Sequence, residues 1–495
     1  MRTYDYWTKK AAGLSIRNQA FVNGRFVNSQ SGKTFDNINP ATAQNIGPVT
    51  ECDKDDVDVA VKVARTVFEE GSWSHMHPAE RGRRLMRLGE LILQHQEELA
   101  LLESLDMGKP VSDAMAIDIP GCARCIHWYG EAADKLMDEI APTDPGALAM
   151  VTREALGVIG IVVPWNFPLL MACWKIGPAL AAGNSIVLKP AEQSPLSILR
   201  LAELASEAGI PDGVFNVLPG FGETAGQALG LHMDVDMIAF TGSTQVGKFF
   251  MQYSGQSNLK RVSLECGGKS PHIITKNCPD LDKAAAAAAS AIFFNQGEVC
   301  TAGSRLLVDR SIKDEFMEKL KAASASHKVG DPLDPDTSMG ALVEEGHMNR
   351  VLGFIDKANA EGAKLELGGC RSAGRDGYFV DPTIFDGVTP DMTIAREEIF
   401  GPVLSVLTFE DEEDAVKIAN DSIYGLAAAV WSQDISQAHR MARAIRAGTV
   451  WVNCWDPTGD MTIPFGGFKQ SGFGRDKSLH ALEKYTDLKT TWVQL

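Results

Sequence analysis

Residues 157–165, GVIGIVVPW, and residues 185–190, SIVLKP, decide the fold class of this chain. Both are short apolar runs, and a helical pattern, LSILRLAELASEAG at 196–209, follows the second one. Two more short apolar runs come next, GVFNVLPG at 213–220 and MIAFTG at 237–242. Short buried strands that alternate with helices predict a parallel, doubly wound sheet of the α/β class.

The pattern changes on both sides of this region. From about residue 55 to residue 140, apolar residues recur every three or four positions, which predicts amphipathic helices. A second alternation comprises PHIIT at 271–275, the helical run LDKAAAAAASAIFF at 281–294 and SRLLVDR at 304–310. We therefore expect a second α/β unit after the first.

Two further segments alternate in the manner of exposed strands. They are AMVTREALGVIGIV at 149–162 and the last eleven residues, YTDLKTTWVQL at 485–495. Unpaired strand edges of this kind favour pairing with another copy of the chain. The pattern predicts a homo-oligomer, either a dimer or a tetramer.

Composition excludes several classes of protein. A chain of 495 residues, 45% hydrophobic and 22% charged, is expected to form two or three domains. Its 47 basic and 64 acidic residues give a net charge of -17, which argues against binding to nucleic acid or to anionic membranes. We found no signal-peptide pattern and no membrane-spanning run, and nine scattered cysteines suggest no disulfide framework. We therefore expect a cytoplasmic protein.

Cys122 and Cys125 form a C-x-x-C spacing within GCARCIHWYG. A zinc site of this type needs a second cysteine pair or histidines at a suitable distance, and the sequence shows none. We interpret both cysteines as parts of a helix and predict no metal site.

Small residues mark a possible phosphate site in FTGSTQVG at 240–247. Gly242, Ser243 and Gly247 lie between an apolar strand and a probable helix start, where a pyrophosphate can approach backbone N–H groups. The motif is not the G-x-G-x-x-G fingerprint, so on its own it also fits a tight structural turn.

Lys189 and Glu192 strengthen the prediction of a dinucleotide site, because they follow the strand of SIVLKP. A carboxylate at this place accepts hydrogen bonds from ribose hydroxyls and repels a 2'-phosphate, which favours NAD over NADP. The charge of Lys189 could tolerate a phosphate, and a solvated strand end is the alternative interpretation of the pair.

Cys300 in FFNQGEVCTAGSR and Glu265 in SLECGGKSP are the candidate catalytic residues. A nucleophile and a carboxylate, each among small residues, are the minimum needed to form a thioester and to hydrolyse it. A free thiol has a pKa of about 8.5, so a catalytic cysteine needs activation. Taken singly, each residue also fits a buried structural role.

Eight motifs, in order and spacing, make the chain resemble the aldehyde dehydrogenase superfamily nearly from end to end: VVPWNFP, LKPAEQSP, PGFGETAG, FTGSTQVG, LECGGKSP, GEVCTAGSR, EEIFGPV and PFGGFKQSGFGR. The resemblance implies three parts. They are a Rossmann-like NAD-binding domain (1–133 and 154–266), an α/β catalytic domain (267–478) and a small β oligomerisation element (134–153 and 479–495).

The resemblance also implies roles for individual residues. Cys300 would attack the aldehyde carbon, and the Asn166 side-chain amide would join the Cys300 backbone N–H in an oxyanion hole. Glu265 would activate the water that hydrolyses the thioester. The cofactor-binding positions would be Val162, Trp165, Lys189, Glu192, Gly222, Gly242, Ser243, Val246, Gly247, Glu398 and Phe400.

Two positions depart from the family pattern. Cys266 follows the predicted base where leucine is common, and it places a second thiol near the site. Asp476 occupies a position where many relatives carry a glutamate that is proposed to relay protons.

The substrate channel is predicted to be lined by Trp174, Trp455, Asp456, Asp460 and Phe465. Aromatic faces and carboxylates suit a cationic tail. The loop that contains Trp455, Asp456, Asp460 and Phe465, together with the C-terminal segment, resembles the subgroup that oxidises ω-amino or γ-glutamylamino aldehydes from polyamine breakdown. Alternatively, both aspartates face water.

Other activities remain open at this point. The enzyme could be a broad-specificity aliphatic or betaine-type aldehyde dehydrogenase, or it could transfer the thioester to coenzyme A. A catalytically silent relative with a structural role is a further alternative, which the presence of Cys300, Glu265 and Asn166 disfavours.

Overall fold

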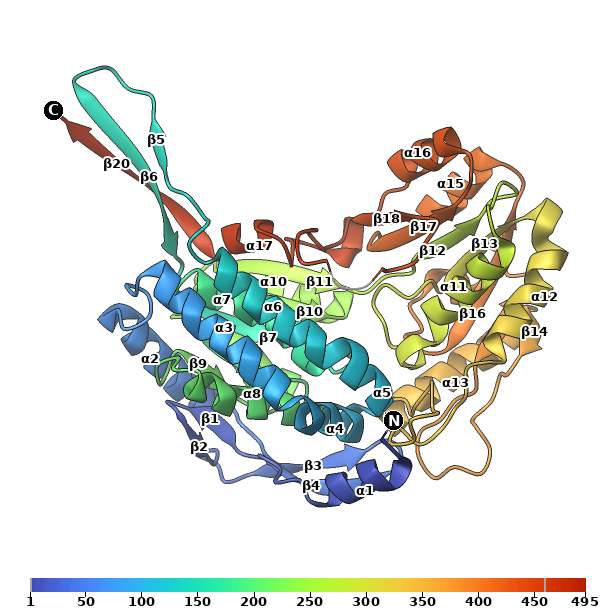
Figure 1. Ribbon diagram of the computed structural model, residues 1–495, viewed down its shortest axis with the longest axis horizontal. Helices are drawn as coiled ribbons and strands as arrows, with labels where there is room; N and C mark the ends of the chain where they lie inside the picture. Colours follow the sequence, from blue (N-terminus) through green and yellow to red (C-terminus); the bar gives the residue numbers. More distant parts are fainter. Residues whose placement is uncertain (1, 458–459) are drawn as a thin grey trace.

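In the computed structural model, which describes residues 2–457 and 460–495, two sheets organise two lobes (Figure 1). The eight strands of the first sheet are β1 (Ala20–Val22), β2 (Arg25–Val27), β7 (Val158–Val162), β8 (Ser185–Lys189), β9 (Phe215–Val217), β10 (Met237–Gly242), β11 (Arg261–Cys266) and β19 (Gly472–Phe473). They are arranged in the order β19-β11-β10-β7-β8-β9-β1-β2.

The prediction of a parallel, doubly wound sheet is confirmed. Strands β7 to β10 come from the four apolar runs named above, and β11 follows them in the chain. These five strands pair in parallel with one another, whereas β9 and β11 pair antiparallel with β1 and β19. Every residue of β7 and β8 is buried. Parallel strands are apolar along their whole length because helices cover both faces of such a sheet.

Helices surround this sheet: α2 (Lys54–Glu70), α3 (Pro78–Gln94), α4 (Gln96–Met107), α6 (Ile119–Ala132), α7 (Pro168–Ala181), α8 (Leu196–Glu207), α9 (Gln227–Leu231) and α10 (Thr244–Gln256). The helical pattern of residues 81–105 is divided between α3 and α4 at His95. Helices α3 and α6 pack closely at Gly82, where a Cβ would lie 2.4 Å from the Gly130 carbonyl oxygen.

The second lobe contains the seven strands β12 (Pro271–Ile274), β13 (Arg305–Asp309), β14 (Lys364–Leu367), β15 (Thr383–Asp386), β16 (Val403–Phe409), β17 (Ala427–Trp431) and β18 (Thr449–Val452). All pair in parallel except β14, which is antiparallel to β15. Its main helices are α11 (Leu281–Phe293), α12 (Lys313–Ser324), α13 (Glu345–Ala360), α15 (Glu412–Asn420) and α16 (Ile435–Ala444). The expected second α/β unit is present.

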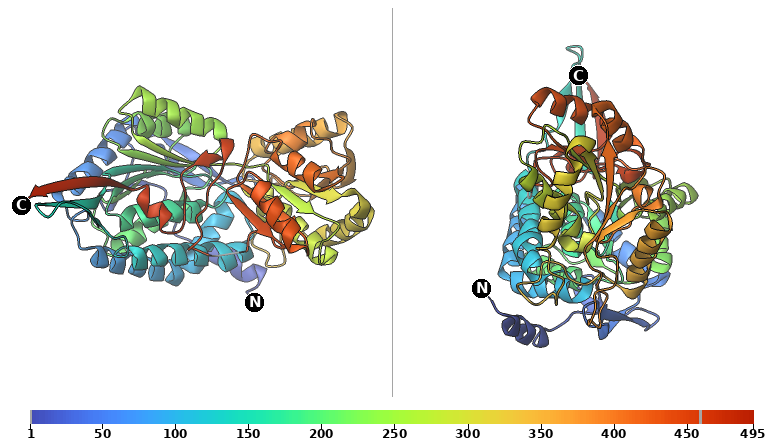
Figure 2. Two further views of the ribbon diagram at one scale, coloured as in Figure 1. Left: turned by 90° about the horizontal axis from the view of Figure 1, so that it is seen from above. Right: turned by 90° about the vertical axis from the view of Figure 1, so that its right-hand side faces the viewer.

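A three-stranded sheet extends away from both lobes, with the C-terminus at its end (Figure 2). Its strands are β5 (Glu139–Ala141), β6 (Ala147–Ala155) and β20 (Thr486–Gln494). Strand β6 lies in the middle, so β5 and β20 each have an edge that no strand of the described residues covers.

The remaining short elements are α1 (Tyr4–Ala12), β3 (Thr34–Asn39), β4 (Gln44–Thr50), α5 (Val111–Asp113), α14 (Thr393–Arg396) and α17 (His480–Glu483). Strand β19 lies within the predicted catalytic segment 267–478, yet it pairs with β11 of the first sheet. The residue bounds of the three domains stay a prediction. Within residues 2–457 and 460–495, none of the helices has the length and apolarity that crossing a lipid bilayer requires.

Candidate active site

The predicted dinucleotide residues gather at one edge of the first sheet. Val162, Lys189 and Gly242 are the last residues of β7, β8 and β10, respectively. Val162 pairs with Lys189 in the sheet. The carboxyl edge of a parallel sheet is where α/β proteins of this kind bind nucleotides. The topology therefore gives these residues, which are far apart in the sequence, a common location.

Lys189 orients Glu192 at this edge. The buried Lys189 ammonium donates to the carbonyl oxygens of Pro190 (2.6 Å) and Gly220 (2.7 Å) and to Glu192 Oε2 (3.1 Å). Burial lowers the pKa of Lys189, and the Glu192 carboxylate opposes this shift. Glu192 itself stays partly exposed, so it can accept hydrogen bonds from a ribose, as the sequence prediction requires. Gly222, two residues after Gly220, begins a short π-helical turn with open space where a Cβ would lie.

The N-terminus of α10 supplies the predicted phosphate site. Ser243 is its N-cap, and its Oγ accepts a hydrogen bond of 3.3 Å from the Val246 N–H. A Cβ on Gly247 would lie 3.1 Å from Cys266 Sγ, so this glycine lets α10 pack closely against β11. The free N–H groups and the dipole of such a helix end favour an anion.

The contact with Gly247 also resolves the position of Cys266. Its thiol faces α10 and does not line the cavity described below. Burial, followed by the charge of Glu265, raises the pKa of Cys266 to about 12. Cys266 is therefore a packing residue in this structure, although it is adjacent to the predicted base in the sequence.

Glu398 and Phe400 lie on a loop between the lobes. Phe400 has a left-handed backbone conformation (φ 60°) and packs edge-on against Trp165, with ring centroids 5.2 Å apart. Its carbonyl oxygen accepts a 2.6 Å hydrogen bond from His347 Nε2. Glu398 Oε1 accepts from the Gly268 N–H at 3.1 Å, and burial raises the pKa of Glu398 to about 7. A non-glycine residue held at positive φ is the kind of strain that accumulates at functional sites.

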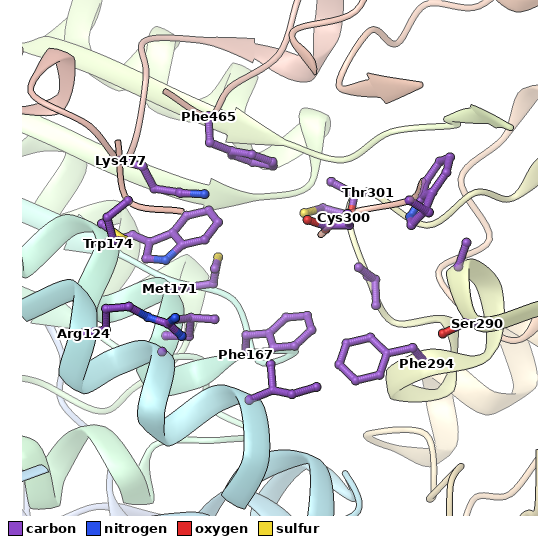
Figure 3. Close-up of a pocket in the computed structure, with 18 of the residues that line it drawn as sticks. Arg124, Phe167, Met171, Trp174, Ser290, Phe294, Cys300, Thr301, Phe465 and Lys477 are labelled. Carbon is purple, nitrogen blue, oxygen red and sulfur yellow. The ribbon is translucent and has the colours of Figure 1, made fainter. Parts of the chain in front are cut away.

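Cys300 lies in the wall of a cavity of about 350 Å³ (Figure 3). The loop that carries it begins with Asn295 and Gln296, both in left-handed conformations. Burial raises the pKa of Cys300 to about 12, and the charges of Glu398, Asp456 and Glu265 add to the effect. These surroundings favour the protonated thiol over the thiolate.

Asn166 is held beside the Cys300 loop by two hydrogen bonds. Its Nδ2 donates to the Glu298 carbonyl oxygen at 2.8 Å, and its own carbonyl oxygen accepts from Asn295 Nδ2 at 3.1 Å. Asn166 is buried. The amide group has two N–H bonds, so one remains to serve as a donor toward a ligand.

Glu265 is buried near the end of β11, and neither carboxylate oxygen has a hydrogen-bond partner among the described residues. Burial and the charge of Asp476 raise the pKa of Glu265 well above its ordinary value, while Lys175, Lys484 and Arg475 oppose the shift. Gly466 leaves room beside this carboxylate, because a Cβ there would lie 2.8 Å from Glu265 Oε1. An uncoordinated, buried carboxylate of raised pKa has the properties of a general base.

Four of the five predicted channel residues line the cavity: Trp174, Trp455, Asp456 and Phe465. Trp174 and Phe465 pack edge-on at 5.2 Å. Asp460 does not line it: this exposed aspartate accepts hydrogen bonds from the backbone and hydroxyl group of Thr462. For Asp460, the water-facing alternative describes the structure.

Asp456 lies in the cavity wall and is exposed to solvent. Its Oδ2 accepts a hydrogen bond of 3.2 Å from the Thr301 hydroxyl group. Burial raises the pKa of Asp456, an effect that the Thr301 hydrogen bond and the charge of Lys477 oppose. One acidic side chain is therefore available to a cationic substrate.

The sequence prediction missed other cavity residues. Arg124 and Lys477 add two cations to the wall, and Phe167, Met171 and Phe294 add apolar surface. Phe167 belongs to the quoted motif VVPWNFP, so its place next to Asn166 was a usable signal. Arg124 and Lys477 come from a helix and a turn whose side chains no motif marks.

Cys122 and Cys125 are buried on α6, where Cys125 donates to the Cys173 carbonyl oxygen. The part of the chain that the structure describes contains no group of three or more side chains suited to hold a metal ion.

A model of the aldehyde dehydrogenase family matches residues 26–491. The chain is 54% identical to the NADP/NAD-dependent aldehyde dehydrogenase PuuC of Escherichia coli (strain K12), over 99% of this chain and 98% of that protein.

Two solved structures are also similar. A variant of the indole-3-acetaldehyde dehydrogenase AldA of P. syringae, in complex with NAD+ and IAA, is 57% identical with a TM-score of 0.99. The gamma-glutamyl-gamma-aminobutyraldehyde dehydrogenase of Burkholderia cenocepacia J2315 is 56% identical with a TM-score of 0.98. Both comparisons cover 100% of each chain. On sequence and structure, this chain belongs to the aldehyde dehydrogenase family.

Proposed function

We propose that this enzyme oxidises aldehydes with an amino or γ-glutamylamino tail to carboxylic acids, with NAD as the electron acceptor. The observation that carries the proposal is that Cys300 and Asp456 share the wall of one cavity. A nucleophile and an anionic group in one chamber suit an aldehyde that has a cationic group at its other end.

The first step is attack by the Cys300 sulfur on the aldehyde carbon. A C–S bond forms and the carbonyl oxygen becomes an oxyanion. Because the surroundings of Cys300 favour the protonated thiol, its proton must leave first, and the Glu398 carboxylate is the candidate to receive it, since its charge raises the thiol's pKa. Substrate binding that separates this charge from the sulfur would favour the thiolate.

Asn166 would stabilise the oxyanion. Its side-chain amide donates to the Glu298 carbonyl oxygen and its backbone carbonyl accepts from Asn295, so the remaining N–H is oriented before the reaction begins. A pre-oriented donor needs no reorganisation as charge develops, which is why such donors accelerate acyl transfer.

The residues at the carboxyl edge of the first sheet fit a dinucleotide. Glu192 and Lys189 would hold the adenosine ribose, the N-terminus of α10 the pyrophosphate, and Glu398 with Phe400 the nicotinamide half. NAD held there would supply the hydride acceptor for the carbon attached to Cys300. The Glu192 carboxylate would repel a 2'-phosphate, which supports NAD over NADP.

Glu265 would act in the second half of the reaction. It removes a proton from water, whose oxygen attacks the thioester carbon, the C–S bond breaks, and the acid leaves with the Cys300 thiol restored. A water-activating carboxylate at this position favours hydrolysis over transfer to coenzyme A.

NADH formation tests the proposal directly. We expect kcat/KM to be higher for 4-aminobutyraldehyde or its γ-glutamyl derivative than for propanal, without coenzyme A. Asp456→Asn should lower the preference for 4-aminobutyraldehyde about 10-fold, the effect of one partly buried charge contact. Equal kcat/KM for all three aldehydes would refute the substrate assignment, and NADH formation only with coenzyme A would refute hydrolysis.

An aryl-substituted aldehyde is the second candidate substrate. It is supported by the aromatic walls formed by Phe167, Trp174, Phe294 and Phe465 and by the similarity to AldA. Adding indole-3-acetaldehyde to the same assay distinguishes the two, because its turnover should not depend on the charge at Asp456.

We further infer a cytoplasmic homo-oligomer built on the three-stranded sheet. Ile140, Leu488 and Trp492 are exposed apolar residues on this sheet, and two of its edges are open. All nine cysteines are free, which suits a reducing compartment. Analytical ultracentrifugation should give a dimer or tetramer, and a chain truncated after residue 485 should sediment as a smaller species.

A further inference from the structure

The cavity wall carries more positive than negative charge. Besides Asp456, its ionisable lining residues other than Cys300 are Arg124 and Lys477. An aldehyde with only an ammonium group would meet one carboxylate and two cations there. A purely cationic tail therefore matches the wall only at Asp456, and it leaves the two cations without a partner.

Lys477 is fixed in position yet has no anionic partner. Its backbone is left-handed (φ 61°), and its ammonium lies 5.4 Å from the centroid of the Trp174 ring. It forms no hydrogen bond or ion pair of its side chain with residues 2–457 or 460–495. Burial lowers the pKa of Lys477, the charges of Asp456 and Asp460 oppose this, and the charge of Arg124 adds to it.

Arg124 reaches the same end of the cavity from α6. Figure 3 shows its side chain and that of Lys477 on one side of the space, with Trp174 between them and Cys300 opposite. Arg124 likewise forms no ion pair with the residues that the structure describes. Two neighbouring cations without a protein anion are a suitable site for an anionic ligand.

We propose that Arg124 and Lys477 form a carboxylate subsite, which selects aldehydes whose tail carries a carboxylate together with an amine. Asp456 would contact the ammonium group while the two cations contact the carboxylate. The subsite lies across the cavity from Cys300, so it would bind the end of the substrate remote from the aldehyde. The proposal rests on aldehyde oxidation at Cys300.

An α-amino-acid head group has this charge pattern. It joins one ammonium and one carboxylate on a single carbon, so it can use all three charged residues of the wall. A γ-glutamylamino aldehyde has such a head, whereas 4-aminobutyraldehyde has the ammonium alone. The subsite thus predicts that the γ-glutamyl form is the better substrate of the two.

The test compares two aldehydes that differ only in this carboxylate: γ-glutamyl-4-aminobutyraldehyde and the same compound with its α-carboxylate converted to a carboxamide. We expect kcat/KM to be about 10-fold higher for the carboxylate, mainly through a lower KM, as for one charge contact. The ratio should fall as salt is added, because part of the site is open to solvent.

Variants of the two cations test whether these residues cause the ratio of the two kcat/KM values. In Lys477→Met and in Arg124→Met the ratio should fall toward 1, and Lys477→Arg should restore it. Lys276→Met is the matched control, since Lys276 is exposed and lies outside the cavity, and it should keep the ratio of the unmodified enzyme.

The outcomes separate the two proposals. If neither aldehyde yields NADH, the proposed function is wrong. If both are oxidised with equal kcat/KM, or if the ratio survives in both methionine variants, the function stands and the carboxylate subsite is wrong. Loss of the ratio in Lys276→Met would also contradict the subsite, because the effect would then depend on total charge.

Discussion

Glu265 and Asp476 are two buried carboxylates that influence each other electrostatically, yet their surroundings differ. Asp476 Oδ2 accepts a 2.8 Å hydrogen bond from Lys175, and Oδ1 accepts one from Lys484. Glu265 has no such partner among the described residues. Although burial alone would raise it, the two lysines hold the pKa of Asp476 below its ordinary value, whereas burial and Asp476 raise that of Glu265.

This difference in hydrogen bonding and pKa distinguishes Asp476, a supporting charge, from Glu265, a reactive carboxylate. Asp476 stays ionised and neutralises Lys175 and Lys484, which keeps these ammonium groups inside the protein. Glu265 retains unused acceptor capacity, at a cost in stability that an apolar replacement would remove. A glutamate at position 476 would reach further, but here Lys484 donates to the shorter aspartate.

Replacing the Cys300 thiol should have the largest effect on activity. Cys300→Ala should lower NADH formation on the order of 10,000-fold or more, because both half-reactions need the covalent bond to sulfur. Steady-state kinetics measures the loss. The control is Cys370→Ala, an exposed thiol outside the cavity, which should keep its kcat. Substantial turnover by Cys300→Ala would contradict the covalent mechanism.

Glu265→Gln removes the reactive member of the pair. We expect kcat to fall by about 100- to 10,000-fold, the usual contribution of a general base. The stability of this variant at neutral pH should instead increase. The raised pKa means that the folded state loses stability as pH rises above 4.5, the ordinary value of a glutamate. Melting curves should therefore show Glu265→Gln gaining stability over the unmodified enzyme at neutral pH but not at pH values below 4.5; a uniform loss would contradict this account.

Asn166→Ala should lower kcat/KM by about 100- to 1,000-fold, the typical cost of one oxyanion-hole donor. A suitable control is Asn216, a buried asparagine whose amide donates to the carbonyl oxygens of Ile186 and Gly213. Asn216→Ala should lower the melting temperature and leave kcat nearly unchanged. Similar kinetic losses in the two variants would make Asn166 a structural residue.

Asp476→Asn removes the supporting member and should destabilise the fold by about 3–5 kcal/mol, because the buried Lys175 and the partly buried Lys484 lose their anion. The lowered pKa of Asp476 means that its contribution is present above pH 3.8 and is lost as pH falls through the folded-state value. Thermal unfolding measures the change, and adding Lys484→Met should recover part of it. An unchanged melting temperature would show that the lysines do not depend on Asp476.

The sequence predicted the first sheet well because β7 and β8 are buried on both faces, so their apolar runs leave little choice of structure. The sequence did not reveal that one helix ends and the next begins at His95, since the apolar periodicity of α3 continues into α4. It placed Asp456 and Asp460 together at the channel. Only Asp456 lines the cavity, and its backbone is left-handed (φ 34°), a property of the fold that residue type does not reveal.

The sequence likewise did not reveal the direction in which side chains point. The sequence could show that Cys266 follows Glu265, but only packing against Gly247 shows where its thiol points. No sequence motif marked Lys477, and its place in the cavity depends on a turn at residues 477 and 478, both with positive φ. Long-range contacts decide such positions.

The most direct test of the separate roles of Cys300 and Glu265 is rapid mixing of the Glu265→Gln variant with NAD and aldehyde. We predict one burst of NADH per active site, followed by slow turnover. Mass spectrometry of the quenched protein should find the acyl group on the peptide that contains Cys300. Absence of the burst, or an acyl group on another cysteine, would contradict the proposal that Glu265 acts chiefly after the hydride has left.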